Sequence, residues 1–218
     1  MTKYLSQALI VVLLVFLKTP LRADSIPEIV AKAKPAIIEI VVTDATGAPK
    51  TLGTGFFVSS DGLVVTNLHV VQGASSIAAI NNNGAVFLFQ KTVAQPPDID
   101  LAILKFQAND VPFVKLGRSI DHVGSVSDGI ISAFRENRSL MQTTAPISQG
   151  SSGSPVMDEM GEVIGVATLE NTQGQNSNFA IAVEKVSAAL MQSPKRTVFR
   201  PGTADSDANA SDRCGRSF

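Results

Sequence analysis

The sequence predicts an all-β fold made of two barrels. Short runs rich in β-branched and aromatic residues follow one another from Ala36 onward, and turn signals such as Asp61-Gly62 and Asn83-Gly84 separate them. The first half contains six such runs, which is enough to close one small barrel. They are Ala36–Thr43, Gly53–Val58, Leu63–Leu68, Ser75–Ile80, Ala85–Val93 and Leu101–Phe106.

The second half contains only five runs, so its barrel is expected to be shortened by one strand. A missing strand leaves unpaired backbone groups on its neighbours. We therefore expect this barrel to be open or irregular near Arg118–Ser127, and a short amphipathic helix to close the domain at Val183–Gln192. The five runs are Ser125–Phe134, Leu140–Thr144, Ser154–Met157, Glu162–Leu169 and Ser177–Val183.

The two ends of the chain differ from the barrels in composition. Residues 1–23 hold an apolar run, Ala8–Leu17, that is shorter than the roughly 20 residues needed to span a bilayer. This pattern predicts a signal peptide cleaved after Ala23, hence a periplasmic or secreted protein without a stable membrane anchor. Ser25 and Glu28 have capping-box spacing and predict a helix ending near Pro35.

The predicted domain organisation follows from these boundaries. One domain covers 24–192, with a first barrel at about 36–116 and a second at about 117–192. The polar tail at 193–218 is expected to be disordered. With 44% hydrophobic residues the chain can bury a sizeable core, and its net charge of −1 gives no electrostatic reason to bind nucleic acid.

A serine held between glycines is the strongest candidate for chemistry. Ser152 lies in the bend Gln149–Val156, where Gly150 and Gly153 permit backbone angles that other residues avoid. Such a bend can direct backbone N–H groups toward one point beside the hydroxyl, as an oxyanion hole requires. Taken alone, a Gly/Ser-rich bend is most often only a turn.

Two upstream segments supply partners for this serine. The chain has two histidines, His69 and His122, and two neighbouring acids, Asp98 and Asp100, open a short apolar run. A single histidine near a strand is often a core residue, and an aspartate at the start of a strand is often a turn former. The order His, Asp, Ser is nevertheless that of chymotrypsin-type proteases, whereas other serine hydrolases use different orders.

Four segments together resemble the HtrA/Deg group of trypsin-like serine proteases, which have the chymotrypsin fold. They are Gly53–Val58, Thr66–Val71, Asp98–Lys105 and Thr143–Val156, and the resemblance extends from about Ile26 to Val186. It implies a catalytic triad of His69, Asp100 and Ser152, in which Asp100 is matched because it directly precedes the Leu-Ala pair. It implies no metal or cofactor.

The same resemblance implies where a substrate binds. The oxyanion donors would be the backbone N–H groups of Gly150 and Ser152. The primary substrate pocket would be shaped by Ile147 and by Asn178, Phe179 and Ala180. No acidic residue matches the base of this pocket, so cleavage is expected after small or medium aliphatic residues rather than after Lys or Arg.

Two functions from different classes remain open. The first is an exported serine endopeptidase that acts on unfolded or damaged proteins in quality control. The second is a protease-like module that has lost turnover and serves as a binding or scaffold domain. The complete triad favours the first. The shortened second barrel favours the second, as does Ser154, which stands where relatives have a glycine.

The resemblance also bears on regulation and assembly. Many members of the group carry a C-terminal PDZ domain, for which the tail after Gln192 is too short. Members of the group often trimerise through N-terminal segments, which leaves a homo-oligomer open for this chain. The resemblance identifies neither the natural substrate nor the means of regulation.

Overall fold

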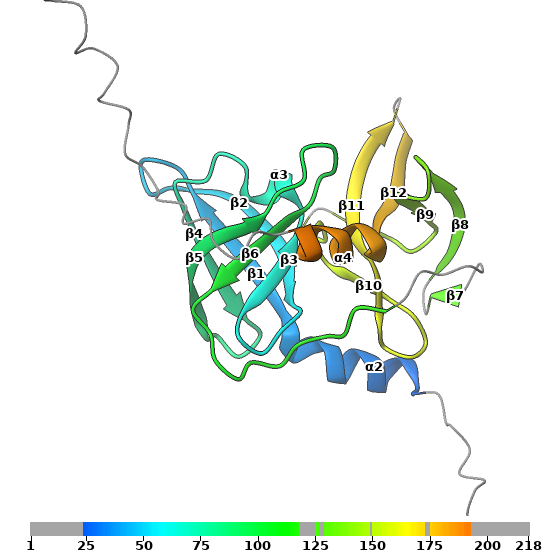
Figure 1. Cartoon of the computed structure of the whole chain (residues 1–218), viewed down its shortest axis with the longest axis horizontal. Helices are drawn as coiled ribbons and strands as arrows, with labels where there is room; N and C mark the ends of the chain where they lie inside the picture. The colour runs from blue at the N-terminus through cyan, green and yellow to red at the C-terminus, as the bar shows by residue number, and fades with distance from the viewer. Residues whose placement is uncertain (1–23, 118–124, 127–128, 149, 173–174, 193–218) are drawn as a thin grey trace, which may run out of the picture.

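The computed structural model describes residues 24–117, 125–126, 129–148, 150–172 and 175–192. The predicted signal peptide and the predicted disordered tail lie outside these residues. Figure 1 shows two β-rich halves side by side, with helix α4 (Val183–Gln192) between them and helix α2 (Ile26–Ala33) along one side. The all-β class that the sequence predicts is confirmed.

The first half is a closed barrel in which the strand order is β1-β2-β3-β6-β5-β4. All six predicted runs appear within a few residues of their expected bounds. Alternate residues such as Ile38, Ile40 and Leu104 are buried inside it. Its strands are β1 (Ile37–Thr43), β2 (Pro49–Phe57), β3 (Leu63–Thr66), β4 (Ser76–Asn81), β5 (Val86–Ala94) and β6 (Ala102–Phe106).

The end of β3 departs from the sequence prediction. A strand was expected to continue to Leu68, but β3 ends at Thr66 and a single helical turn, α3 (Leu68–Val71), follows. Asn67 is the N-cap of the turn by position, and its side chain makes no capping hydrogen bond. Within this turn the Val70 side chain packs into the barrel core, whereas the side chain of its neighbour His69 is exposed.

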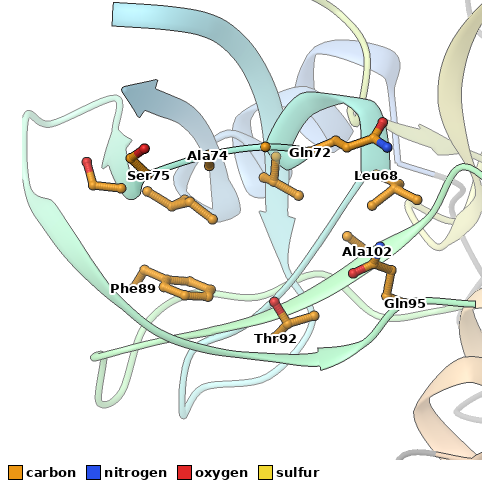
Figure 2. A pocket seen from close by; sticks show the side chains of 12 residues that line it. Leu68, Gln72, Ala74, Ser75, Phe89, Thr92, Gln95 and Ala102 are labelled. Atoms are coloured by element: carbon orange, nitrogen blue, oxygen red, sulfur yellow. The ribbon is translucent and has the colours of Figure 1, made fainter. Parts of the chain in front are cut away.

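A cavity of about 450 Å³ lies beside α3 in the first half. Leu68 and Gln72 line it from the α3 side, opposite Phe89, Thr92 and Gln95 on and after β5 (Figure 2). His69 does not line this cavity. The cavity is therefore separate from the groups to which the sequence assigns chemistry.

The second half is a sheet in the order β10-β11-β12-β9-β8-β7. The predicted strand Ser125–Phe134 corresponds to β7 and β8, which pair with each other in antiparallel fashion, and residues 127–128 between them lie outside the described residues. Five longer strands make up most of the sheet, as the sequence predicts. The bounds are β7 (Ser125–Val126), β8 (Gly129–Arg135), β9 (Leu140–Thr143), β10 (Pro155–Met157), β11 (Val163–Thr172) and β12 (Gln175–Ala182).

Strand β10 lies at one edge of this sheet, which is relevant to the expected opening of the second barrel. Within the described part of the chain, β10 pairs with β11 and with no second strand. Residues 118–124 and 127–128, where the irregularity was expected, lie outside the described residues. The predicted opening therefore stays a prediction for that interval.

The two helices end up where the sequence predicts. The Glu28 carboxylate accepts hydrogen bonds from the N–H and the hydroxyl of Ser25, at 2.8 and 2.9 Å, which confirms the expected capping box. A 3-10 turn, η1 (Lys34–Ala36), connects α2 to the first barrel. Among the residues described, no helix is both long and apolar enough to cross a membrane.

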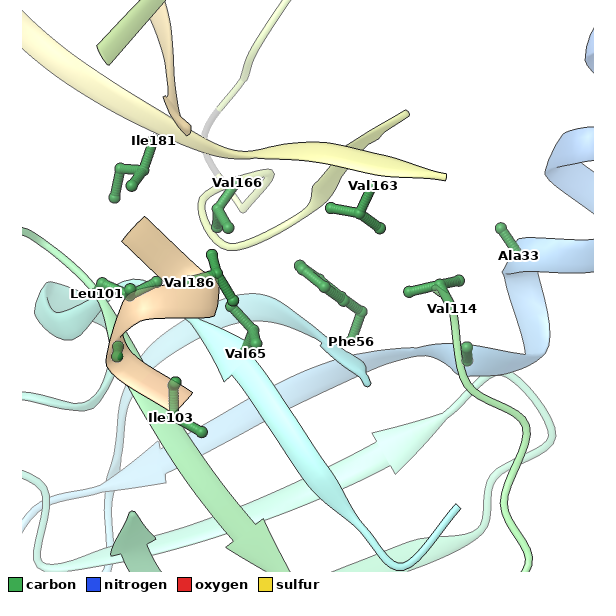
Figure 3. Packing of buried hydrophobic residues seen from close by; sticks show 12 residues of the cluster. Ala33, Phe56, Val65, Leu101, Ile103, Val114, Val163, Val166, Ile181 and Val186 are labelled. Carbon is green, nitrogen blue, oxygen red and sulfur yellow. The ribbon is translucent and has the colours of Figure 1, made fainter. Parts of the chain in front are cut away.

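A hydrophobic core lies between the two halves (Figure 3). Phe56 and Val65 of the first barrel pack with Val166 of β11 and Ile181 of β12, and Val186 of α4 completes the cluster. Each of these side chains is at most 1% exposed. Burial of each large apolar side chain contributes about 1.5–3 kcal/mol, so this core fixes how the two halves sit against one another.

Candidate active site

His69 and Asp100 form a two-point contact. The backbone N–H of His69 donates to Asp100 Oδ1 at 2.8 Å, and His69 Nδ1 lies 2.6 Å from Asp100 Oδ2. One carboxylate thus orients both the main chain and the ring of the histidine. The His69 side chain is 45% exposed, so its ring remains accessible to a substrate.

Two further side chains hold the aspartate, and the sequence prediction missed both. The amide of Asn67 donates to the Asp100 backbone carbonyl at 2.9 Å, and the hydroxyl of Thr168 donates to Asp100 Oδ2 at 3.1 Å. Asn67 is fully buried and Thr168 is 6% exposed. Asn67 stands two residues before His69, where its position could have suggested a role. Thr168 lies 68 residues from Asp100, and no local pattern connects them.

The electrostatics of this pair suit a general base. Burial by itself would raise the pKa of Asp100, but the hydrogen bonds from the His69 side chain and backbone and from Thr168 outweigh it, and the pKa is lowered. The hydrogen bond to Asp100 raises the pKa of His69, against the opposing effect of burial. An ionised carboxylate therefore stabilises the imidazolium that forms when His69 accepts a proton.

The loop that carries Ser152 is fastened to the first barrel by Thr54 on β2. The Thr54 N–H donates to the Ser152 carbonyl at 2.9 Å, and the Thr54 hydroxyl donates to the Gly150 carbonyl at 2.7 Å. Gly150 and Gly153 have φ values of +91° and +89°, which favour glycine. A Cβ at position 153 would overlap the Thr54 carbonyl oxygen, so only glycine fits there.

Strand β11 brings the serine loop and the aspartate together. The Gly153 N–H donates to the Ala167 carbonyl at 2.9 Å, and the next residue, Thr168, contacts Asp100. Two adjacent residues of one strand thus hold both segments. No hydrogen bond joins the Ser152 hydroxyl to His69 in the described part of the chain, where the His69 side chain bonds only to Asp100. The role of Ser152 beside His69 therefore stays a prediction. His122, the other histidine, lies outside the described residues.

Two backbone amides of the serine loop donate to no backbone carbonyl among the described residues. The N–H groups of Ser151 and Gly153 donate to the Ser148 and Ala167 carbonyls. Within the described part of the chain, no backbone carbonyl accepts the N–H of Gly150 or Ser152. These are the two amides that the sequence predicts as oxyanion donors.

The predicted substrate-pocket residues occupy different environments. Ile147 lines a groove of about 950 Å³ between α2 and the serine loop. The Asn178 side chain donates to the Ala145 carbonyl at 2.8 Å and so braces the segment before that loop. Phe179 is 3% exposed, and Ala180 packs inside the core of the second half. The structure thus places only Ile147 directly on the groove.

We also examined whether side chains that can bind a metal ion lie close together. In the residues that the structure describes, no three His, Cys, Asp or Glu side chains gather as a metal ion would require. The candidate residues themselves are one imidazole, one carboxylate and a serine hydroxyl, with backbone amides next to the serine. This set can perform acyl transfer by nucleophilic attack.

Comparison with known proteins agrees with this geometry. Residues 53–166 match the trypsin-like peptidase domain, an interval that contains His69, Asp100 and Ser152. The chain belongs to the HtrA/Deg family of trypsin-like serine proteases. Serine protease HTRA1A of Danio rerio is 33% identical over 210 residues, which cover 82% of this chain and 43% of that protein. Serine endoprotease DegS of Haemophilus influenzae is 31% identical over 180 residues, which cover 69% of this chain and 51% of that one.

Solved structures of HtrA/Deg proteases have the same fold. The serine endoprotease from Yersinia pestis superposes with a TM-score of 0.66 at 28% identity, covering 77% of this chain and 66% of that one. The HtrA-type protease AlgW with tripeptide gives a TM-score of 0.65 at 30% identity, covering 78% and 63%. The chain spans about half or less of the length of the two curated relatives named above.

The contact between His69 and Asp100 predicts how this HtrA/Deg domain titrates. The Asp100→Asn substitution removes the negative charge that stabilises the imidazolium, so the pKa of His69 should fall. In the wild-type domain the base is lost as the pH drops through the raised pKa of His69. NMR titration of the imidazole signals, assigned with a His122→Gln variant, measures the change. The neighbouring substitution Asp98→Asn is the control, and an equal fall of the pKa in that variant would contradict the assignment of Asp100.

Proposed function

We propose that this chain is a serine endopeptidase in which Ser152 is the nucleophile, His69 the general base and Asp100 the residue that orients the histidine. The observation that carries the proposal is the two-point contact of Asp100 with His69. The attachment of the Ser152 loop and Asp100 to adjacent residues of β11 supports it.

The proposed reaction proceeds through an acyl-enzyme. The Ser152 oxygen bonds to the carbonyl carbon of the substrate while His69 takes the hydroxyl proton, and the carbonyl electrons move onto its oxygen. The N–H groups of Gly150 and Ser152 stabilise that oxyanion, a contribution of about 3–4 kcal/mol per donor in measured cases. The C–N bond then breaks, and the leaving amine receives the proton from His69. Water repeats the sequence and releases the acid.

The proposed substrates are unfolded or damaged proteins outside the cytoplasm. The apolar leader predicted at 1–23 supports export to the periplasm or the exterior. A groove beside the serine loop supports an extended substrate; Ile147, Ser151 and Ser154 line it, whereas His69 and Ser152 do not. Because the chain spans only part of the length of its relatives, hydrolysis by the protease domain is the only one of their activities proposed for it.

Substitution of the nucleophile tests the proposed activity. Ser152→Ala should lower the hydrolysis of casein by at least about a thousandfold, since the hydroxyl forms the covalent intermediate. A fluorophosphonate probe should label Ser152 in the wild-type protein, as located by mass spectrometry. Ser154→Gly installs the residue that relatives carry and is the matched control, which should keep its activity.

Two results would contradict the proposal. One is equal hydrolysis by the Ser152→Ala variant and the wild-type protein. The other is a folded wild-type protein that neither hydrolyses casein nor reacts with the probe. The second result would support a binding or scaffold module, an alternative favoured by the pairing of β10 with β11 alone in the described part of the chain.

Ile147 and the family resemblance together predict the cleavage preference. Ile147 is a medium-sized aliphatic side chain, and the resemblance matches no carboxylate to the base of the primary pocket, so small or medium aliphatic residues are expected at the cleaved position. We expect a peptide-library profile led by Ala, Val and Leu. Ile147→Ala enlarges the pocket and should shift the profile toward larger apolar residues. A wild-type profile dominated by Arg or Lys would refute this specificity.

A further inference from the structure

The side chain of Thr54 makes a contact that the triad does not explain. Its hydroxyl donates across the boundary between the two halves to the Gly150 carbonyl, 96 residues away along the chain. Thr54 is itself held from within the first barrel, because the fully buried Thr66 donates its hydroxyl to the Thr54 carbonyl at 2.7 Å. The hydroxyl of Thr54 therefore acts from a fixed position.

The peptide group between Gly150 and Ser151 is held at both of its ends. Its carbonyl accepts from the Thr54 hydroxyl at 2.7 Å, and its N–H donates to the Ser148 carbonyl at 3.0 Å. A peptide group is planar, so it rotates as one unit, and rotation here breaks both hydrogen bonds. The contact with Thr54 thus fixes the plane of this peptide.

This peptide lies between the two amides of the serine loop whose N–H groups donate to no carbonyl among the described residues. The Gly150 N–H precedes it and the Ser152 N–H follows it. Gly150 has a φ of +91°, a conformation from which glycine can move with little steric penalty. Without the Thr54 hydroxyl, only the Ser148 contact would hold this peptide, so the Cα atoms of Gly150 and Ser151 that connect it to the two neighbouring amides would be less firmly placed.

We propose that Thr54 is a positioning residue, whose hydroxyl fixes the Gly150–Ser151 peptide and thereby aims the oxyanion donors of Gly150 and Ser152. The inference rests on the proposed function for its catalytic consequence. Whether Thr54 fixes the Gly150–Ser151 peptide, however, does not depend on whether the protein hydrolyses a substrate. Preorganised donors act most strongly when they need no reorientation during the reaction.

Two matched substitutions isolate the hydroxyl. Thr54→Val keeps the branched shape and removes the hydrogen bond, whereas Thr54→Ser keeps the hydroxyl and removes only a methyl group. The amide NMR signals of Gly150 and Ser152, and their hydrogen exchange, report on the loop without any substrate. In Thr54→Val we expect these two signals to shift and their exchange to accelerate. In Thr54→Ser we expect both to stay close to the wild-type values.

Kinetics then measure the catalytic consequence. Thr54→Val should lower kcat about tenfold, as loss of a single hydrogen bond suggests, with KM changed by less than about twofold. The affinity for a peptide aldehyde, whose adduct places an oxygen at the oxyanion position, should fall by the same factor as kcat/KM. Thr54→Ser should restore both quantities.

The outcomes separate this inference from the proposed function. Unchanged amide signals in Thr54→Val would overturn the positioning role, and so would equal losses in the Val and Ser variants. If the wild-type protein proves inactive, the proposed function fails, yet the amide signals of Thr54→Val still decide whether Thr54 fixes the peptide. Circular dichroism of both variants establishes that each one is folded.

Discussion

Thr54 and Gly153 approach each other so closely that no side chain fits between them. A Cβ at position 153 would overlap the Thr54 carbonyl and would lie 2.6 Å from the Thr66 hydroxyl. This close approach lets the Thr54 N–H reach the Ser152 carbonyl and the Thr54 hydroxyl reach that of Gly150. The serine loop of the second half is thereby built against a strand of the first, and the rest of the candidate site depends on this contact.

Apolar and polar contacts have different roles in the assembly of the site. The core of Phe56, Val65 and Val166 brings the two halves together, but hydrophobic burial has no preferred direction. Hydrogen bonds are directional, and those of Thr54 set where the serine loop lies. Strand β3 contributes to both, because Val65 packs in the shared core and the next residue, Thr66, anchors Thr54. The same segment continues to His69 through Asn67, which contacts Asp100.

The sequence predicts most of the fold because its strands are short and separated by clear turns. It also predicts the pairing of His69 with Asp100, through chain order and the resemblance to a family. It does not reveal the break between β3 and α3, because the apolar run continues past Thr66 and only burial of Val70 shows where the chain turns. Contacts between residues far apart in sequence, such as Thr54 with Gly150, depend on how the two halves pack. No local pattern could have shown them.

The most direct measurement is the rate at which a fluorophosphonate labels Ser152 in a Gly153→Ala variant. The account predicts a fall of at least about a hundredfold, because a displacement of about 1 Å in a reacting group can have that effect. Gly84→Ala is the matched control: Gly84 also has a positive φ, +80°, but a Cβ there meets no atom within 4 Å. This variant should be labelled at the wild-type rate. Wild-type labelling of a folded Gly153→Ala variant would contradict the claim that the approach of Thr54 to Gly153 forms the site.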